Sequence, residues 1–237
     1  MFKRGFIVFV LFSSLISVAQ VKQKDKTSEK HKAPRGNTRI DKIVPFTGNY
    51  KTTGFEVGDS APEIVFYTRD NKVVSLHKLL SGHVPVLLIS GSYTCNMFRE
   101  HINDINEIAA YYKNRLNIYV IYTLEAHPDN AICPYTGDEF TSLDNAADNI
   151  YFPQHTRYKD RKAMADTMVA QLHLGIPVLI DGPDNKWWRT YGSLPNNAYL
   201  VDTTGIIKGN NHQLNGPGEN IWCYIDSYLG TNSGNCQ

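Results

Sequence analysis

The stretches VPVLLISGSYTCNMF, residues 84–98, and IYVIYTLEAH, residues 118–127, decide the fold. Each begins with an apolar run of strand length, and such runs are typical of strands buried on both faces of a parallel sheet. Between them, apolar side chains recur at helical spacing and predict an amphipathic helix over residues 96–114. A strand, a helix and a second strand in this order predict a βαβ unit, whose two strands are parallel and usually neighbours.

This unit brings three polar side chains to one edge of the sheet. Cys95 follows the first strand at the amino terminus of the helix, whereas Glu125 and His127 follow the second strand. Ligands of open α/β sheets bind along the edge formed by the carboxyl ends of the strands. We therefore expect the thiol, the carboxyl and the imidazole to converge there.

Cys95 is predicted to be a reactive thiol. Free N–H groups and the dipole at a helix start favour an anion, which lowers the pKa of a cysteine there from about 8.5. Cysteine is also common in inert cores, but the Gly-Ser turn at residues 91–92 and a position outside the apolar stripe favour the reactive interpretation. Glu125 and His127 would then move protons beside a thiolate, although His127 could instead merely cap its strand.

The flanking sequence extends the βαβ unit into an α/β domain that begins near Phe55. Runs of β-branched and aromatic residues predict strands, and apolar residues at helical spacing predict helices. The expected elements are a strand at 64–67, a turn at 70–71, a strand at 73–74, a helix at 76–80 and a helix at 159–172.

The amino terminus has the pattern of a secretory signal peptide. Lys3 and Arg4 precede a short apolar run, and Ser17-Val18-Ala19 supplies the small residues of a cleavage site. The apolar run is shorter than the roughly 20 residues that span a bilayer. We therefore expect export to a periplasm or to the outside of the cell, with no stable membrane anchor.

Four segments follow from these patterns. Residues 1–19 are the signal peptide, and residues 20–54 are polar and basic, with too little apolar content to form a core. This second segment is expected to be a flexible linker, the alternative being contact with an anionic surface. Residues 55–232 form the folded domain, and residues 233–237 form a tail.

The composition is that of an ordinary globular protein. The 237 residues include 24 Lys and Arg against 23 Asp and Glu, a formal net charge of +1, and 42% are hydrophobic. These values exclude a collagen-like or low-complexity chain. A nearly neutral chain also has no general electrostatic attraction for nucleic acid, so no nucleic-acid partner is expected.

Cysteine spacing limits the redox chemistry. Asn96-Met97-Phe98 follows Cys95, which excludes a thioredoxin-type CxxC dithiol. Cys133 follows His127 on a loop and is a candidate resolving thiol, although a free Cys133 is the alternative. Cys223 and Cys236 are candidates for a structural disulfide. No paired metal-ligand spacing supports a zinc site, so we expect no metal and no cofactor.

Several motifs in series resemble known families. VGDSAP at residues 57–62 resembles the redoxins and peroxiredoxins, and GSYTC at 91–95 followed by EAH at 125–127 resembles the iodothyronine deiodinase family. That family usually has selenocysteine at the position of Cys95. The resemblance implies a thioredoxin-like α/β fold with a central mixed sheet flanked by helices. It continues through His155, Asp160-Arg161, residues 177–181, Leu194-Pro195 and Gly216-Pro217.

The resemblance also implies roles for individual residues. Cys95 would be the nucleophile, Glu125 and His127 would stand beside it, and Leu194-Pro195 would be the cis-proline step that faces the active site. Cysteine in place of selenocysteine favours peroxide or disulfide chemistry over dehalogenation. Asn96 and Met97, where the family often has proline, and a divergent loop at 129–150 also argue against iodothyronines as the substrate. The remaining pocket residues implied are Ser92, Thr94, His155, Arg161 and Pro195.

We therefore expect an exported thiol-dependent oxidoreductase. Cys95 would attack a peroxide oxygen, a disulfide sulfur or a polarised halogen. The expected partners are a small-molecule electrophile and a thiol reductant, with a homodimer left open. Two alternatives remain: a deiodinase-type reductive dehalogenase, and a binding module on a redoxin scaffold without turnover. A reactive Cys95 thiol would favour the oxidoreductase and the dehalogenase, and an unreactive one would favour the binding module.

Overall fold

The computed structural model describes residues 32–129, 131–140 and 142–236. The predicted signal peptide and residues 20–31 lie outside these described residues. Within them, the strands form one mixed sheet in the order β2-β1-β5-β4-β3-β6-β7. The strands β3, β4 and β5 are parallel, and the other neighbouring pairs are antiparallel. The strands are β1 Val65–Thr68, β2 Val73–Ser75, β3 Val86–Gly91, β4 Asn117–Tyr122, β5 Val178–Ile180, β6 Ala198–Val201 and β7 Ile207–Asn211.

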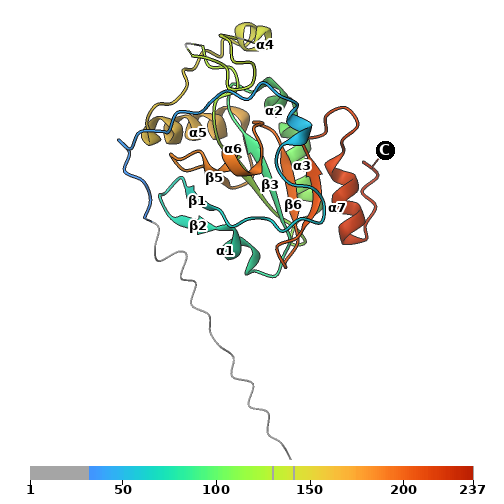
Figure 1. Cartoon of the computed structure of the whole chain (residues 1–237). Helices are drawn as coiled ribbons and strands as arrows, with labels where there is room; N and C mark the ends of the chain where they lie inside the picture. Colours follow the sequence, from blue (N-terminus) through green and yellow to red (C-terminus); the bar gives the residue numbers. More distant parts are fainter. Residues whose placement is uncertain (1–31, 130, 141, 237) are drawn as a thin grey trace, which may run out of the picture.

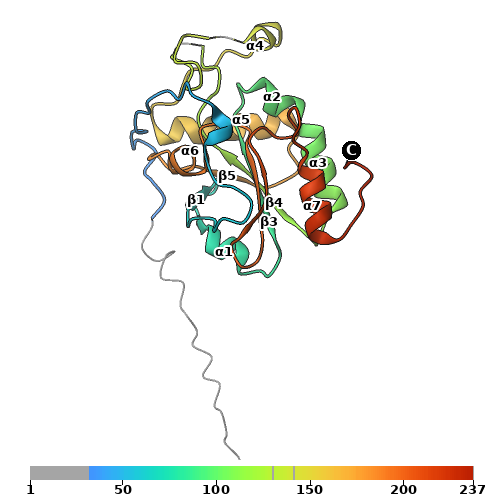
Figure 2. The ribbon, with the colours of Figure 1, turned by 45° about the vertical axis from the view of Figure 1, so that its right-hand side comes forward.

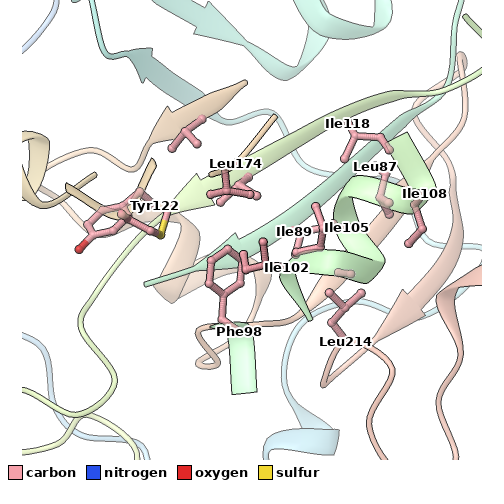
Figure 3. Packing of buried hydrophobic residues seen from close by; sticks show 14 of the residues in the cluster. Leu87, Ile89, Phe98, Ile102, Ile105, Ile108, Ile118, Tyr122, Leu174 and Leu214 are labelled. Carbon is pink, nitrogen blue, oxygen red and sulfur yellow. The ribbon is translucent and has the colours of Figure 1, made fainter. Parts of the chain in front are cut away.

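The predicted βαβ unit forms the centre of this sheet. β3 and β4 pair in parallel from Val86 opposite Asn117 to Gly91 opposite Tyr122. Alternate side chains of each strand point to opposite faces, and every residue of β3 is buried. Leu87 and Ile89 of β3 meet the apolar residues of the following helices on one face (Figure 3). β3 is therefore buried on both faces, as its composition indicates, whereas Asn117 and Tyr119 of β4 are only partly buried.

Helices cover both faces of the sheet (Figures 1 and 2). The helices α3, α5 and α7 contribute to one apolar cluster, and α1 and α6 contribute to the other. The helix predicted at 159–172 is α5, which begins one residue earlier. No helix in the described ranges is long and apolar enough to cross a membrane. The helices are α1 Leu76–Leu80, α2 Asn96–Glu100, α3 Ile102–Tyr111, α4 Leu143–Ala147, α5 Tyr158–Leu172, α6 Lys186–Tyr191 and α7 Ile221–Leu229, with a 3₁₀ turn at Tyr50–Thr52.

The prediction of a single helix over residues 96–114 is wrong, because the structure has two helices there, α2 and α3. His101 has a backbone ψ of 9°, outside the α-helical range, so it ends α2 and precedes α3. Its Nδ1 lies 2.9 Å from an oxygen of Asp104 in the first turn of α3. Phe98 and Ile102, on either side of the break, are both buried. The apolar pattern therefore survives a break that periodicity does not reveal.

Part of the segment expected to be a flexible linker makes backbone hydrogen bonds with the folded domain. The backbone N–H of Ile40 donates to the carbonyl of Thr156 at 2.9 Å, and that of Phe46 donates to Pro134 at 2.9 Å. In Figure 1 this segment, drawn in blue, crosses the molecule beside α5. Because its partners are backbone groups, a basic composition gives no sign of them. We call residues 32–46 the docked arm.

A disulfide joins Cys223 in α7 to Cys236, as the sequence suggests, with the two Cα atoms 4.7 Å apart. The intervening chain is also held by hydrogen bonds, because the backbone N–H and the hydroxyl of Ser233 donate to Asp226 at 2.8 and 2.7 Å. The expected tail is thus attached to the domain as far as Cys236.

Removal of this disulfide should destabilise the protein. It closes a loop with a sequence separation of 13, for which the loss of unfolded-state entropy corresponds to about 3 kcal/mol. We expect Cys223→Ser/Cys236→Ser to lower the free energy of unfolding in urea by that amount. Dithiothreitol should lower the stability of the parent protein and leave the double variant unchanged. Equal sensitivity of both proteins to the reductant would contradict this assignment.

Candidate active site

Cys95 lies at the predicted helix start, where it is the N-cap of α2. Its Sγ accepts the backbone N–H of Phe98 at 3.4 Å. The approach of α2 to the end of β3 depends on Gly91, because a Cβ there would lie 2.5–2.9 Å from atoms of the Phe98 ring. The Gly-Ser turn therefore allows the helix to begin directly above the strand.

The predicted acidity of the Cys95 thiol is wrong for this conformation. The side chain is only 3% exposed, and burial raises the pKa of the thiol to about 12. The backbone N–H groups of Phe98 and Met97 and the charge of Arg99 act in the opposite direction, but more weakly. The start of α2 does favour a lower pKa for the Cys95 thiol, as the sequence predicts, but burial raises this pKa by more.

Glu125 meets the Cys95 turn, as the βαβ geometry predicts. Its Oε2 accepts the backbone N–H of Thr94 at 2.8 Å and the Thr94 hydroxyl at 2.6 Å. The hydroxyl of Tyr122 donates to the other carboxyl oxygen. The carboxyl therefore ties the segment that follows β3 to the end of β4, and it is fully buried.

A third segment fixes the backbone of Glu125. The side-chain amide of Gln154 accepts from the Glu125 N–H and donates to the Glu125 carbonyl, both at 3.0 Å. Burial raises the pKa of the Glu125 carboxyl to about 7, against the opposing hydrogen bonds from Thr94 and the charge of Arg161. Glu125 therefore titrates near neutral pH, unlike an ordinary carboxyl group.

His127 reaches the same turn through its backbone, whose N–H donates to the Thr94 hydroxyl at 3.1 Å. Its ring packs against Phe140 at a centroid distance of 5.0 Å. Burial lowers the pKa of the imidazole, which is consequently neutral at pH 7. Its Nδ1 is buried without a hydrogen-bond partner in the part of the chain that the structure describes.

Ser92 and His155 lie on either side of the Glu125 segment. The Ser92 hydroxyl accepts the backbone N–H of Ala126 at 3.2 Å, and His155 Nε2 lies 3.0 Å from the Thr123 carbonyl oxygen. Burial lowers the pKa of His155 well below its usual value, so this histidine is neutral and its Nε2 donates to that carbonyl. Both residues thus support the strand end that leads to Glu125.

Arg161 is fully buried behind the site. Its guanidinium donates to the carbonyls of Asp181 and Gly182 at 3.2 and 2.7 Å and to the side chain of Asn185 at 2.6 Å. These contacts hold the loop after β5. The charge of Arg161 also favours ionised Glu125, which it influences without a direct hydrogen bond.

The cis-proline step expected at Leu194-Pro195 is wrong. The described residues contain no cis peptide bond. This loop still lies beside the end of β3, because the hydroxyl of Ser90 donates to the Leu194 carbonyl at 3.0 Å. Pro195 is therefore near the predicted edge without the geometry that the resemblance implies.

Sequence reasoning missed Asn145 and Arg99. Asn145, in α4, donates to the Thr94 carbonyl at 2.9 Å and accepts from Arg99 at 2.7 Å. Arg99 also donates to the Tyr93 carbonyl at 3.1 Å. The loop expected to be merely divergent thus returns to the Cys95 turn. The sequence of α4 gave no amphipathic signal of this, because Leu143 is exposed and Asn145 is buried.

Cys133 is a free cysteine, like Cys95, and its side chain is fully buried. It stands in a tight turn, where its N–H donates to the Asp138 carbonyl at 2.8 Å and its carbonyl accepts from Gly137 at 3.0 Å. Tyr135 of this turn packs against Trp188 at 5.0 Å between ring centroids. Tyr135 also packs against the apolar cluster that contains Cys95.

The sequence comparisons agree with this arrangement. The family model of iodothyronine deiodinase matches residues 13–220. The chain belongs to the iodothyronine deiodinase family. It is 26% identical over 151 residues to type I iodothyronine deiodinase of Xenopus laevis and 25% identical over 152 residues to thyroxine 5-deiodinase of Sparus aurata. Each match covers 64% of this chain, and the chain spans only 55% and 52% of these deiodinases.

Solved structures confirm the thioredoxin-like fold of this family member. The thioredoxin domain of a thiol-disulfide oxidoreductase from Bacteroides vulgatus is 14% identical, with a TM-score of 0.51 over 74% of this chain and 99% of that one. A protein provisionally named a thiol:disulfide interchange protein, DsbE, from Chlorobium tepidum is 18% identical. Its TM-score is 0.51 over 75% of this chain and 100% of that one. At these identities the likeness concerns the fold alone.

The raised pKa of Glu125 predicts a pH-dependent contribution to stability. Between the ordinary value of 4.5 and about 7, the folded protein binds more protons than the unfolded chain. The contribution of Glu125 therefore falls as pH rises through this window and is constant above it. We expect the free energy of unfolding of the parent to fall, relative to Glu125→Gln, by on the order of 3 kcal/mol across the window.

Urea unfolding at intervals across this window measures the effect. Asp181, whose pKa burial raises to about 6, contributes to both proteins alike, so their difference isolates Glu125. The variant has a lower absolute stability because its amide faces hydrogen-bond donors. Parallel stability profiles for the two proteins would show that Glu125 does not titrate in this range.

Proposed function

We propose that this protein is a thiol-dependent oxidoreductase with Cys95 as its nucleophile. One observation carries the proposal: a free cysteine caps α2 in a turn that the buried Glu125 carboxyl holds through Thr94. Membership of a family whose matched relatives are deiodinases supports redox chemistry at this position. The N–H groups at the start of α2 are suited to a thiolate.

The reaction requires that substrate and water reach the Cys95 sulfur, which is buried. The cysteine lies in an apolar cluster that includes Tyr93 and Phe98. When substrate and water reach the sulfur, the burial that raises its pKa is lost, whereas the N–H of Phe98 and the charge of Arg99 still favour the thiolate. The closed conformation keeps the thiol protonated, and opening activates it.

The chemical step on a peroxide can be written completely. The Cys95 sulfur forms a bond to the terminal oxygen, the O–O bond breaks, and the leaving alkoxide takes up a proton. Cys95 is oxidised by two electrons to a sulfenic acid, and the peroxide is reduced to an alcohol. A reductant thiol then forms a mixed disulfide with loss of water, and a second thiol releases reduced Cys95. Neutral His127 is suited to take the thiol proton and pass it to the leaving oxygen.

Reductive dehalogenation is the second candidate, favoured by the family match over residues 13–220. Here the Cys95 sulfur bonds to the halogen, the carbon–halogen bond breaks, and the carbon takes up a proton. A reductant thiol displaces halide from the resulting sulfenyl halide and leaves a mixed disulfide, which a second thiol reduces. Cysteine is a weaker nucleophile and leaving group at neutral pH than selenocysteine, which favours peroxide or disulfide substrates.

We also propose that the protein acts outside the cytoplasm. The signal-peptide pattern of residues 1–19 supports export. The disulfide between Cys223 and Cys236 supports an oxidising compartment, where such bonds persist. A thiol reductant would then have to be supplied in that compartment.

Substitution of the nucleophile tests the function. Turnover of a peroxide, an alkyl disulfide and an iodinated phenol is measured with dithiothreitol as reductant. We expect Cys95→Ser to abolish every activity that the parent shows, and His127→Ala to lower kcat by roughly 10² to 10⁴ because the proton acceptor is lost. His77→Ala, an exposed histidine in α1, should match the parent. Turnover that survives in Cys95→Ser would refute the assignment, and a parent inert toward all three substrates would favour a binding module.

We further propose Cys133 as the resolving thiol. Both cysteines are free, and Cys133 lies on the turn that also carries Tyr135. After stoichiometric peroxide, tryptic mapping without reduction should recover Cys95 joined to Cys133, and Cys133→Ser should instead accumulate over-oxidised Cys95. Recovery of Cys95 joined only to an added small thiol would contradict an internal resolving step and leave the nucleophile assignment standing.

A further inference from the structure

The hydroxyl of Tyr135 is an unexplained polar group in an apolar place. The ring packs against Trp188 in α6, and the hydroxyl oxygen is buried without a hydrogen-bond partner among the described residues. Buried tyrosine hydroxyls usually have a partner, because an unpartnered one costs free energy. Phenylalanine would fill the same space against Trp188 without this cost. The hydroxyl therefore calls for a reason other than packing.

Tyr135 lies within electrostatic reach of the candidate nucleophile and of the carboxyl that holds its turn. The ionisable groups that act on it are Cys95, then Cys133, then Glu125. Tyr135 also belongs to the shell of side chains around the apolar cluster that includes Cys95. Burial, and to a smaller extent these groups, raise the pKa of the phenol well above 10, so it keeps its proton and can act as a donor.

A second unpartnered atom lies in the same region. His127 Nδ1 is buried without a partner in the described ranges, and His127 contacts Thr94, the residue before Cys95, through its backbone. Its imidazole thus adds a second polar atom with unused hydrogen-bonding capacity, on a segment that is held to the Cys95 turn.

We propose that the Tyr135 hydroxyl donates a hydrogen bond to the atom that leaves when Cys95 attacks its substrate. This inference rests on the proposed function and names a substrate-contacting residue for it. When the thiolate attacks a disulfide, the S–S bond breaks and the leaving sulfur takes the electron pair as a thiolate. A phenol hydrogen bond stabilises this charge, and the phenol keeps its proton.

A hydrogen bond from Tyr135 to the leaving atom can be distinguished experimentally from simple packing of the ring. A hydrogen bond to the leaving atom matters most when that atom is strongly basic, because more charge develops on it before it is solvated. Loss of the donor should therefore slow a disulfide with a basic leaving thiolate much more than one with an acidic leaving group. A tyrosine that only packs against Trp188 would affect both disulfides equally.

The experiment compares Tyr135→Phe with the parent toward two uncharged disulfides. Dithiodipyridine has an acidic leaving group, and hydroxyethyl disulfide has a basic one. The second-order rate of mixed-disulfide formation at Cys95 is followed by mass spectrometry. We expect the alkyl rate to fall about 10- to 100-fold and the aryl rate to fall less than about 3-fold, as for loss of a hydrogen bond to a charged atom. The ratio of the two rates cancels any change in how often the Cys95 sulfur becomes accessible, because both disulfides depend on it equally.

Tyr151→Phe is the matched control, because Tyr151 is a half-exposed tyrosine of the same loop region. It should leave both rates unchanged, and thermal unfolding of each variant checks that the fold persists. An unchanged rate ratio in Tyr135→Phe overturns this inference alone. A parent whose Cys95 reacts with neither disulfide overturns this inference, and the proposed function falls with it only if the parent is also inert toward the peroxide and the iodinated phenol.

Discussion

The site depends on one buried carboxyl group. Burial of Glu125 without partners would be costly, and the donors from Thr94 and Tyr122 offset that cost. Thr94 follows β3 and Tyr122 ends β4, so the hydrogen bonds to the carboxyl hold the carboxyl ends of these two strands together. The Cys95 turn and the segment carrying His127 are thereby held in one geometry. Because the same burial makes Glu125 easy to protonate, the tie is sensitive to pH near neutrality.

Two opposing effects meet at Cys95. The start of α2 favours a thiolate, whereas the apolar cover favours a thiol, and the cover dominates while it is closed. A resting thiol in this state is protected from solvent oxidants, because oxidation follows thiolate character and exposure. Reactivity is thus restricted to molecules that can reach the buried sulfur.

The parts of the structure that follow from local pattern could be predicted. The apolar runs gave β3 and β4, and strand order then placed Glu125 beside the Cys95 turn. The contact between Asn145 and Thr94 could not be anticipated, since two polar residues far apart in the chain leave no periodic signal. The break at His101 and the depth of the cover over the thiol depend equally on tertiary packing. The relative placement of Cys95 and Glu125 was therefore easier to infer than the protonation state of either group.

The docked arm also determines when the domain can be completed. Ile40 and Phe46 leave the ribosome early, but they bind Thr156 and Pro134, which are made much later. Contacts between such distant positions form slowly, because the intervening chain must first be ordered. The arm is therefore expected to attach last, over a sheet and helices that have already assembled. Until then, the turn that carries Pro134 lacks one of its backbone anchors.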